Sequence, residues 1–311
     1  MSLNFTIVDA FTNKPFCGNP AAVIVLPEGH SLPDSTLQGI AIEFNISETA
    51  FVTRPADCSL KKGPDCNDYV EFGLRWFTPG REVRLCGHAT LATSSVLFAD
   101  ESLVPPHVNE IHFSTLSGIL KARRAGQQPP KFELAFPSGM VEPATADIEK
   151  YAREIVAEAI KDKVEVLFVG VSRREPYDNY LLIEIDGSAP LKGMEVDAGR
   201  LGPAGTQFTI VTICQRTSSG DAGSGSGYDY RVFAAPEGIQ EDPVCGSAIS
   251  LSASYWESKT RSEVREDEGA EFVNHVRAVS SRGGEIDAVC VGGLVKLRGE
   301  ARVASRGEIF L

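Results

Sequence analysis

The sequence predicts an α+β protein of two similar halves, each a curved, mostly antiparallel sheet around a helix of small residues. Most segments alternate apolar and polar residues with a period of two, which is typical of half-buried strands. In addition, one motif occurs at 85–89 and again at 244–248: an apolar residue, Cys, Gly, a polar residue and Ala. Each copy opens a stretch rich in small residues, and such thin helices suit enclosure by a curved sheet.

Strands are expected along the whole chain. In 69–77, the apolar side chains from Val70 to Trp76 share one face in steps of two, and 131–136 alternates in the same way. Further strands are expected around 5–9 and at 22–26, 111–115, 118–123, 164–169, 179–186, 207–214, 228–234, 294–298, 300–304 and 307–311.

Helices are few and are expected at matching points of the two halves. The segments 34–44 and 147–161 are predicted helices, and the second carries a clear apolar stripe that includes Ile148 and Ile155. Each is followed later by one of the small-residue helices, 87–98 and 246–257.

The chain of 311 residues is long enough for two domains. The strand pattern breaks at 123–130, so the first domain is expected to span 1–122 and to be completed by 294–311. The second is then 123–293. The Gly- and Ser-rich stretch 216–227 lies between two expected strands and is interpreted as a long hairpin loop.

Composition restricts the class of protein. A net charge of −12 and a pI near 5.0 argue against sequence-independent nucleic-acid binding, and no apolar run approaches membrane-spanning length. Seven cysteines with irregular spacing are most simply reduced thiols in the cytoplasm. Cys58 and Cys66 flank a polar turn, but they lack the second pair that a zinc site needs.

The repeated Cys-Gly motif places Cys86 and Cys245 at equivalent helix starts. Unpaired N–H groups and the positive end of a helix dipole favour a thiolate and attract a carboxylate there. A free cysteine is more often a small buried hydrophobe, yet the repetition favours a catalytic interpretation. Two activated thiols that face one cleft would form an acid/base pair.

Several short motifs follow one another along the chain. They are Asp9-Ala10-Phe11-Thr12, Gly18-Asn19-Pro20-Ala21, Asn45-Ile46-Ser47-Glu48-Thr49, Phe77-Thr78-Pro79, Cys86-Gly87-His88-Ala89-Thr90, Pro203-Ala204-Gly205-Thr206, Asp242-Pro243-Val244-Cys245-Gly246-Ser247 and Ser281-Arg282-Gly283-Gly284-Glu285. In this order they resemble the PhzF (phenazine biosynthesis-like) family. The resemblance implies the diaminopimelate-epimerase-like fold, in which two similar domains each wrap a barrel-like sheet around a central helix, with the active site between them. It also suggests a homodimer.

The resemblance also implies roles for residues of these motifs. Glu48 corresponds to the family's general acid/base, which moves a proton to and from carbon. The remaining candidates are expected to bind the substrate or to help move protons, with the two glycines offering backbone N–H groups to its carboxylate: Asn19, Gly87, His88, Asp242, Gly246 and Ser247.

Cys245 departs from the PhzF pattern, which often has Thr at that position. Diaminopimelate epimerase and proline racemase, on the same fold, carry Cys-Gly in both halves. We therefore expect a cofactor-independent isomerase of a small amino-acid-like carboxylate, in which Cys86 and Cys245 act as two bases at the α-carbon. The alternatives are a 1,3-proton shift by Glu48, a dehydratase or lyase, and a non-catalytic binding protein. No metal, nucleotide or pyridoxal site is expected.

Overall fold

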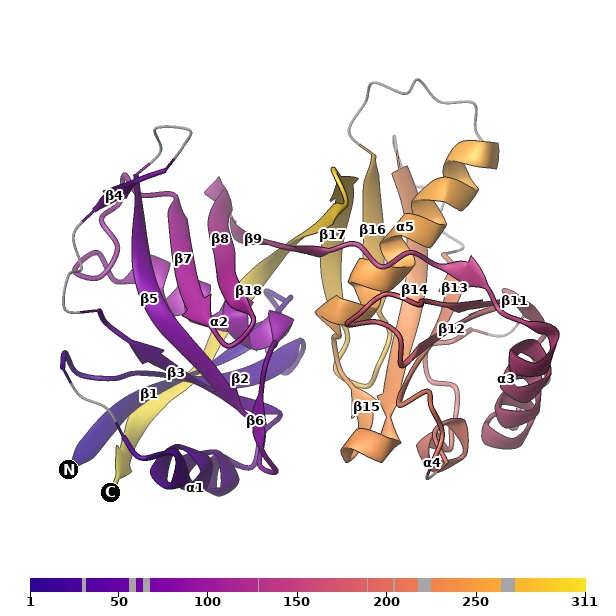
Figure 1. Cartoon of the computed structure of the whole chain (residues 1–311), viewed down its shortest axis with the longest axis horizontal. Coiled ribbons are helices and arrows are strands. Elements are labelled where there is room, and N and C mark those ends of the chain that lie inside the picture. The colour runs from indigo at the N-terminus through magenta and orange to yellow at the C-terminus, as the bar shows by residue number, and fades with distance from the viewer. Residues whose placement is uncertain are drawn as a thin grey trace. The chain divides into compact units, whose positions relative to one another are not determined.

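The structure is a computed structural model that describes residues 1–29, 32–55, 60–63, 68–127, 129–188, 190–203, 205–217, 225–263 and 272–311 (Figure 1). The chain divides into two compact units. The first unit is Met1–Ala135 with Arg298–Leu311, and the second unit is Phe136–Leu297. Cys58 and Cys66, and residues 218–224 of the expected hairpin loop, lie outside the described residues, whereas Lys61 and Lys62 of the expected turn form a short strand that pairs with Tyr69 and Asp68.

The first unit consists mainly of strands, with two helices. The helices are α1 (Asp34–Phe44) and α2 (Gly87–Ala99). The strands are β1 (Ser2–Ala10), β2 (Asn19–Val25), β3 (Glu48–Thr53), β4 (Lys61–Lys62), β5 (Asp68–Phe77), β6 (Glu82–Val83), β7 (Glu110–Thr115), β8 (Gly118–Gln127) and most of β9 (Pro130–Pro137) and β18 (Leu294–Phe310).

The main strands of the first unit form a ring. Its order is β18, β1, β2, β3, β5, β7, β8 and β9, and β9 pairs back with β18. The pairs β2–β3 and β5–β7 are parallel, whereas β1 and β8 are antiparallel to both of their neighbours. The expected barrel-like sheet is therefore present, and closing the ring leaves it without an open edge.

Helix α2 is the central helix of this barrel. It contacts β1, β2, β3 and β8, and every side chain from His88 to Ser94 is buried. The hydroxyls of Thr93 and Ser94 donate to the carbonyls of Ala89 and Thr90, both at 2.7 Å. Because these hydroxyls are satisfied by the helix itself, the helix can be polar in composition and still be enclosed.

The second unit has the same mixture of elements. Its helices are α3 (Ala146–Ala159), α4 (Ala198–Leu201), a 3₁₀ turn (Ala235–Glu237) and α5 (Gly246–Glu263). The strands are β10 (Glu142–Pro143), β11 (Val166–Val171), β12 (Tyr180–Ile185), β13 (Ile210–Arg216), β14 (Gly225–Ala234), β15 (Ile239–Asp242), β16 (Val273–Ala278) and β17 (Gly284–Val291).

The sheet of the second unit repeats the strand directions of the first. The pairs β11–β12, β13–β14 and β16–β17 are antiparallel, and β12–β13 and β14–β16 are parallel. Helix α5 lies between β14 and β16 in the chain, as α2 lies between β5 and β7, and it packs on β14, β16 and β17. The repeated Cys-Gly motif therefore reflects a repeated fold.

Three features differ from the sequence-based expectations. The first unit extends to Ala135, beyond the expected 122, because β8 and β9 form a hairpin across the polar stretch. Helix α3 does not occupy the place of α1: it precedes β11, and α4 is the element between the parallel strands β12 and β13. The three closing strands are one long strand, β18, with a register shift where it pairs with Ile7 and Val8.

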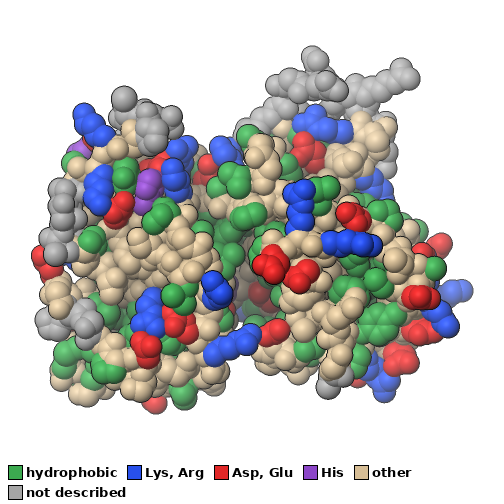
Figure 2. All heavy atoms as spheres, viewed as in Figure 1, with side chains coloured by type: hydrophobic (Ala, Val, Ile, Leu, Met, Phe, Trp, Pro, Cys, Tyr) green, Lys and Arg blue, Asp and Glu red, His purple; other side chains and the backbone are tan. Residues whose placement is uncertain are grey.

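The surface charge is mixed on the face drawn in Figure 2. Blue and red side chains of the described residues are interspersed there, and no broad basic surface is seen. Within the described residues, no helix is both long enough and apolar enough to cross a membrane.

Candidate active site

The first cluster of candidate residues lies at the ends of two elements of the first unit. Helix α1 ends at Asn45, whose left-handed backbone (φ 49°) turns the chain toward Ser47 and Glu48, the first residue of β3. Cys86 precedes α2 with an extended backbone (φ −146°), and His88 lies in the first turn of that helix. These two junctions place Glu48, Cys86 and His88 together, which we call the Glu48–Cys86–His88 cluster.

The distances in this cluster are those of an ion pair beside a thiol. His88 Nε2 lies 2.9 Å from Glu48 Oε2, and Cys86 Sγ lies 3.5 Å from His88 Nδ1. Glu48, Cys86 and His88 retain only 8%, 7% and 6% of their exposure. Glu48 Oε2 thus has the His88 ring as its partner, and no further donor among the described residues is aligned with it.

The charges in the cluster stabilise one another. Burial disfavours the Glu48 carboxylate, but His88, with hydrogen bonds from Ser47 and Cys86, outweighs burial and lowers the pKa of Glu48. Burial opposes protonation of His88 as well, yet Cys86 and Glu48 raise its pKa well above the usual value. The resting pair is therefore a carboxylate beside an imidazolium.

The expected thiolate at Cys86 is not what the structure favours. Burial and the negative charge of Glu48 raise the pKa of Cys86, and the attraction of His88 offsets this only in part. The N–H groups at the helix start do stabilise a thiolate, but the free-energy cost of removing the charged sulfur from water is larger than this stabilisation. The pKa of Cys86 therefore lies above its usual value, which disfavours a thiolate there.

Asn19 joins this cluster through Ser47. The Ser47 hydroxyl lies 3.2 Å from Asn19 Oδ1, 2.7 Å from the carbonyl of Pro20 and 3.2 Å from His88 Nε2. Asn19 is fully buried at the start of β2. Ser47 was present in the Glu48 motif but was assigned no role from the sequence, because its contacts are with residues distant in the chain.

The second cluster lies at the start of α5 in the second unit. Cys245 Sγ lies 3.3 Å from Ser247 Oγ, and the Tyr180 hydroxyl donates to that same oxygen at 2.8 Å. The backbone N–H of Cys245 donates to the Tyr230 hydroxyl at 3.1 Å, and Asp242 accepts from the backbone N–H of Val244 at 3.1 Å. We call this the Asp242–Cys245–Ser247 cluster.

Cys245 is a protonated thiol. Burial and the neighbouring charge of Asp242 raise its pKa well above the usual value. Tyr180 and Tyr230 have raised pKa values, chiefly because they are buried, so both are neutral donors. These two tyrosines were missed from the sequence, where nothing distinguishes them from the core residues of their strands.

The candidate glycines begin the two central helices. Gly87 is the first residue of α2 and Gly246 the first of α5. The first N–H groups of a helix lack intrahelical acceptors, so both positions suit an anionic group. A Cβ at Gly246 would lie 3.2 Å from Leu297 Cδ1, so a side chain there would also be tight.

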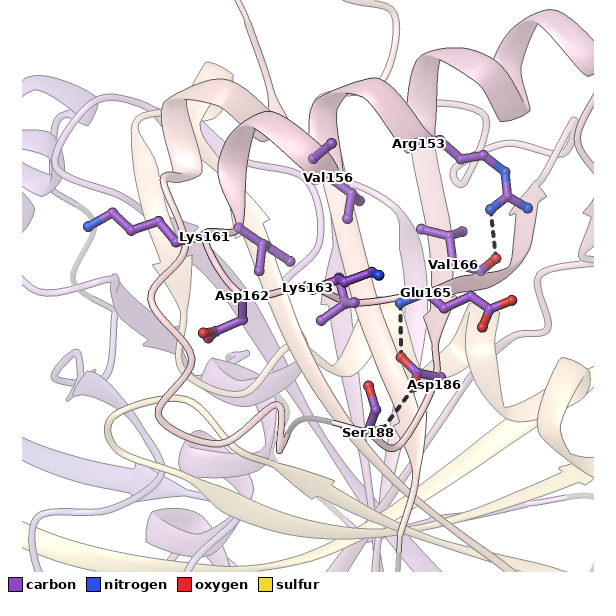
Figure 3. Close-up of a pocket in the computed structure, with 12 residues that line it drawn as sticks. Arg153, Val156, Lys161, Asp162, Lys163, Glu165, Val166, Asp186 and Ser188 are labelled. Carbon is purple, nitrogen blue, oxygen red and sulfur yellow. Dashed lines mark hydrogen bonds between the residues drawn. The ribbon is translucent and has the colours of Figure 1, made fainter.

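A separate hollow of about 660 Å³ lies between α3 and β11 (Figure 3). Arg153 donates to the carbonyl of Val166 there, and Asp186 accepts from the N–H groups of Glu165 and Ser188. None of the candidate residues lines this hollow. Arg153 and Asp186 therefore hold local backbone there.

Comparison with known proteins shows the family of the chain. The chain matches the phenazine biosynthesis-like (PhzC-PhzF) family over residues 8–307. It is 34% identical over the full length of both chains to a protein of Halalkalibacterium halodurans named as an uncharacterized isomerase. A PhzF-family crystal structure from Enterococcus faecalis superposes with a TM-score of 0.76 at 29% identity, covering all of both chains.

The fold extends to more distant proteins. A probable proline racemase from Agrobacterium radiobacter has a TM-score of 0.53 at 12% identity, covering 99% of this chain and 93% of that one. It therefore shares the two-unit architecture. Because the family match spans nearly the whole chain and the full-length relative is itself named an isomerase, the chain belongs to the phenazine biosynthesis-like family and is an enzyme of the isomerase class.

Proposed function

We propose that the chain moves a proton between carbons of a small, amino-acid-like carboxylate without a cofactor, and that Glu48 carries the proton. The observation that carries this proposal is the Glu48 carboxylate itself. It is buried, and its Oε2 lies 2.9 Å from Nε2 of the His88 imidazolium. A buried carboxylate can take a proton from carbon and return it.

In this reaction the proton moves only between the substrate and Glu48, so no other donor or acceptor is needed. The carboxylate takes a proton from one carbon, and the electrons of the broken C–H bond pass into the adjoining conjugated system. The protonated Glu48 then returns the same proton to a carbon two positions away, and the product is an isomer. A substrate carboxylate beside His88 would share the imidazolium and raise the pKa of Glu48, making it a better base in the complex.

A two-base reaction by Cys86 and Cys245 is the second candidate. It is favoured by one observation: both thiols immediately precede a Gly that opens a central helix. This reaction needs one of the thiols as a thiolate, and burial raises the pKa of both. Cys245 has Ser247, not an imidazole, at the position that corresponds to His88. We therefore place the thiol pair second.

Solvent exchange separates these candidates. A panel of amino acids and unsaturated amino-acid-like carboxylates is incubated with the enzyme in heavy water, and deuterium entry at carbon is followed by NMR. Loss of exchange in Glu48→Gln, with Cys245→Ser still active, supports the Glu48 shift. The reverse result supports the thiol pair. A product of altered mass identifies a lyase, and binding without exchange identifies a non-catalytic protein.

The proposed enzyme acts as a homodimer in the cytoplasm, on a small molecule rather than on nucleic acid. Asn19, Gly87, Asp242, Gly246 and Ser247 hold the substrate. Sedimentation equilibrium measures the oligomeric state directly, and a monomer at working concentrations overturns that part of the proposal.

A further inference from the structure

The Glu48–Cys86–His88 cluster carries the donor atoms of a transition-metal site. One carboxylate oxygen, one sulfur and one ring nitrogen lie within 4.8 Å of one another, and all three residues are buried. Of the residues that the structure describes, this is the one such group. We propose that these residues bind one thiophilic divalent cation, such as Zn²⁺ or Co²⁺, in competition with the carboxylate substrate.

The geometry is close to what such an ion needs. His88 Nε2 lies 2.9 Å from Glu48 Oε2 and 4.0 Å from Cys86 Sγ. Tetrahedral coordination with usual bond lengths separates neighbouring ligand atoms by about 3.4–3.6 Å. Each of these two pairs therefore has to change by about 0.5 Å, which side-chain rotation supplies. Three protein ligands leave a fourth position for water.

Burial also suits this place to a cation. Glu48 is 8% exposed, and its Oε2 is held by the His88 ring at 2.9 Å. A buried carboxylate needs a positively charged or hydrogen-bonding partner. A cation at the centre of the cluster would take that part when His88 gives up its Nε2 proton.

The second unit provides an internal comparison. Cys245 also immediately precedes a helix-opening Gly, but its neighbours are Ser247 and Asp242, and no histidine contacts it among the described residues. Zinc and cobalt sites with one thiolate usually also use imidazole. We therefore expect binding at the first unit and none at the second.

Binding of the metal ion displaces protons from two of its ligands. The Cys86 S–H bond and the His88 Nε2–H bond break, S–metal and N–metal bonds form, and two protons pass to the buffer. Glu48 then coordinates the metal and no longer accepts a proton from carbon. Inhibition of turnover is a consequence that rests on the proposed function, whereas the binding itself does not.

Cobalt binding tests the proposal without any substrate. The reduced, chelator-treated full chain is titrated with Co²⁺, and absorbance is recorded in the near ultraviolet and the visible. We expect one equivalent to bind with a sulfur-to-cobalt charge-transfer band and tetrahedral d–d bands. Cys86→Ser should abolish the charge-transfer band, His88→Gln should weaken binding at least about tenfold, and Cys245→Ser should leave both unchanged.

A second measurement needs no variant. Zn²⁺ should protect Cys86 from alkylation in the native chain, read peptide by peptide by mass spectrometry, while Cys17 and Cys245 keep their rates. The proposal is wrong if Cys86 is not protected, if Cys86→Ser keeps the charge-transfer band, or if Cys245→Ser removes it. Metal binding with no isomerase activity would leave this proposal intact and overturn only the proposed function.

Discussion

His88 Nε2 lies 2.9 Å from Glu48 Oε2 in the interior of the first unit, and the two residues hold opposite charges there. Neither ion would be stable alone at this depth, since each loses most of its hydration. Together they keep a carboxylate charged at neutral pH in a place from which water is largely removed. This pair is the basis for the first prediction.

Glu48→Gln should lower proton exchange by at least about 100-fold, because the amide cannot accept a proton from carbon. The matched control is Glu110→Gln, since Glu110 is another buried glutamate in contact with a histidine, His112, in the same unit. Rates of deuterium incorporation are compared at equal folded fraction, checked by circular dichroism. Equal losses in the two variants would show that Glu48 acts only through folding.

Cys245 should react slowly with iodoacetamide at neutral pH, because burial and Asp242 raise the pKa of its thiol. A raised pKa moves the onset of thiolate reactivity upward, so the rate should begin to rise only above the ordinary thiol range of about 8.5. Peptide-resolved mass spectrometry across a pH series measures this. A midpoint below the ordinary value would restore the thiol pair as the leading mechanism.

Glu110 should make the first unit less stable in acid. Although burial opposes its ionisation, His112 and Arg123 lower its pKa below the usual 4.5. Its ionised form therefore stabilises the folded state above the unfolded-state pKa, and this contribution is lost as the pH falls through the lower folded-state value.

The measurement is urea unfolding of the native chain and of Glu110→Gln between neutral pH and about pH 3. The variant should be less stable at neutral pH, and its free energy of unfolding should fall less steeply on acidification. Parallel curves for the two proteins would exclude this carboxylate as a source of the acid dependence.

Ala92→Leu should destabilise the protein by about 1–3 kcal/mol, because α2 is enclosed by the barrel and Ala92 is fully buried. The control is Ala99→Leu, at the exposed last residue of the same helix, which should change stability by less than about 0.5 kcal/mol. Chemical denaturation compares the two free energies of unfolding. A tolerated leucine at position 92 would contradict close enclosure.

Local sequence determined many elements directly. In β5, the apolar face from Val70 to Trp76 is buried as predicted, because a strand places alternate side chains on opposite faces. The two helices that open with Cys-Gly begin where the motif predicts. Glu48, in contrast, became a candidate only through the family motif, since a glutamate at the start of a strand has no distinctive local pattern.

Other elements could not be predicted in this way. Strands β3, β16 and β17 were not expected from alternation, and β3 is buried over nearly its whole length, so its two faces do not differ in polarity. Local sequence patterns also do not predict the order and direction of the strands in the sheet. The parallel pairs β2–β3 and β14–β16 join segments separated by a helix, and only packing of the whole unit selects them.

The sequence by itself determined the family, the repeated architecture and the residue types available for chemistry, because these depend on local pattern and composition. Only the tertiary structure decided the state of those residues. It brings Ser47 to Asn19 and His88, and it supplies Tyr180 and Tyr230 to the second cluster. It also raises the pKa of Cys86 and Cys245, because burial is a property of the whole fold and here outweighs the local effect of a helix start.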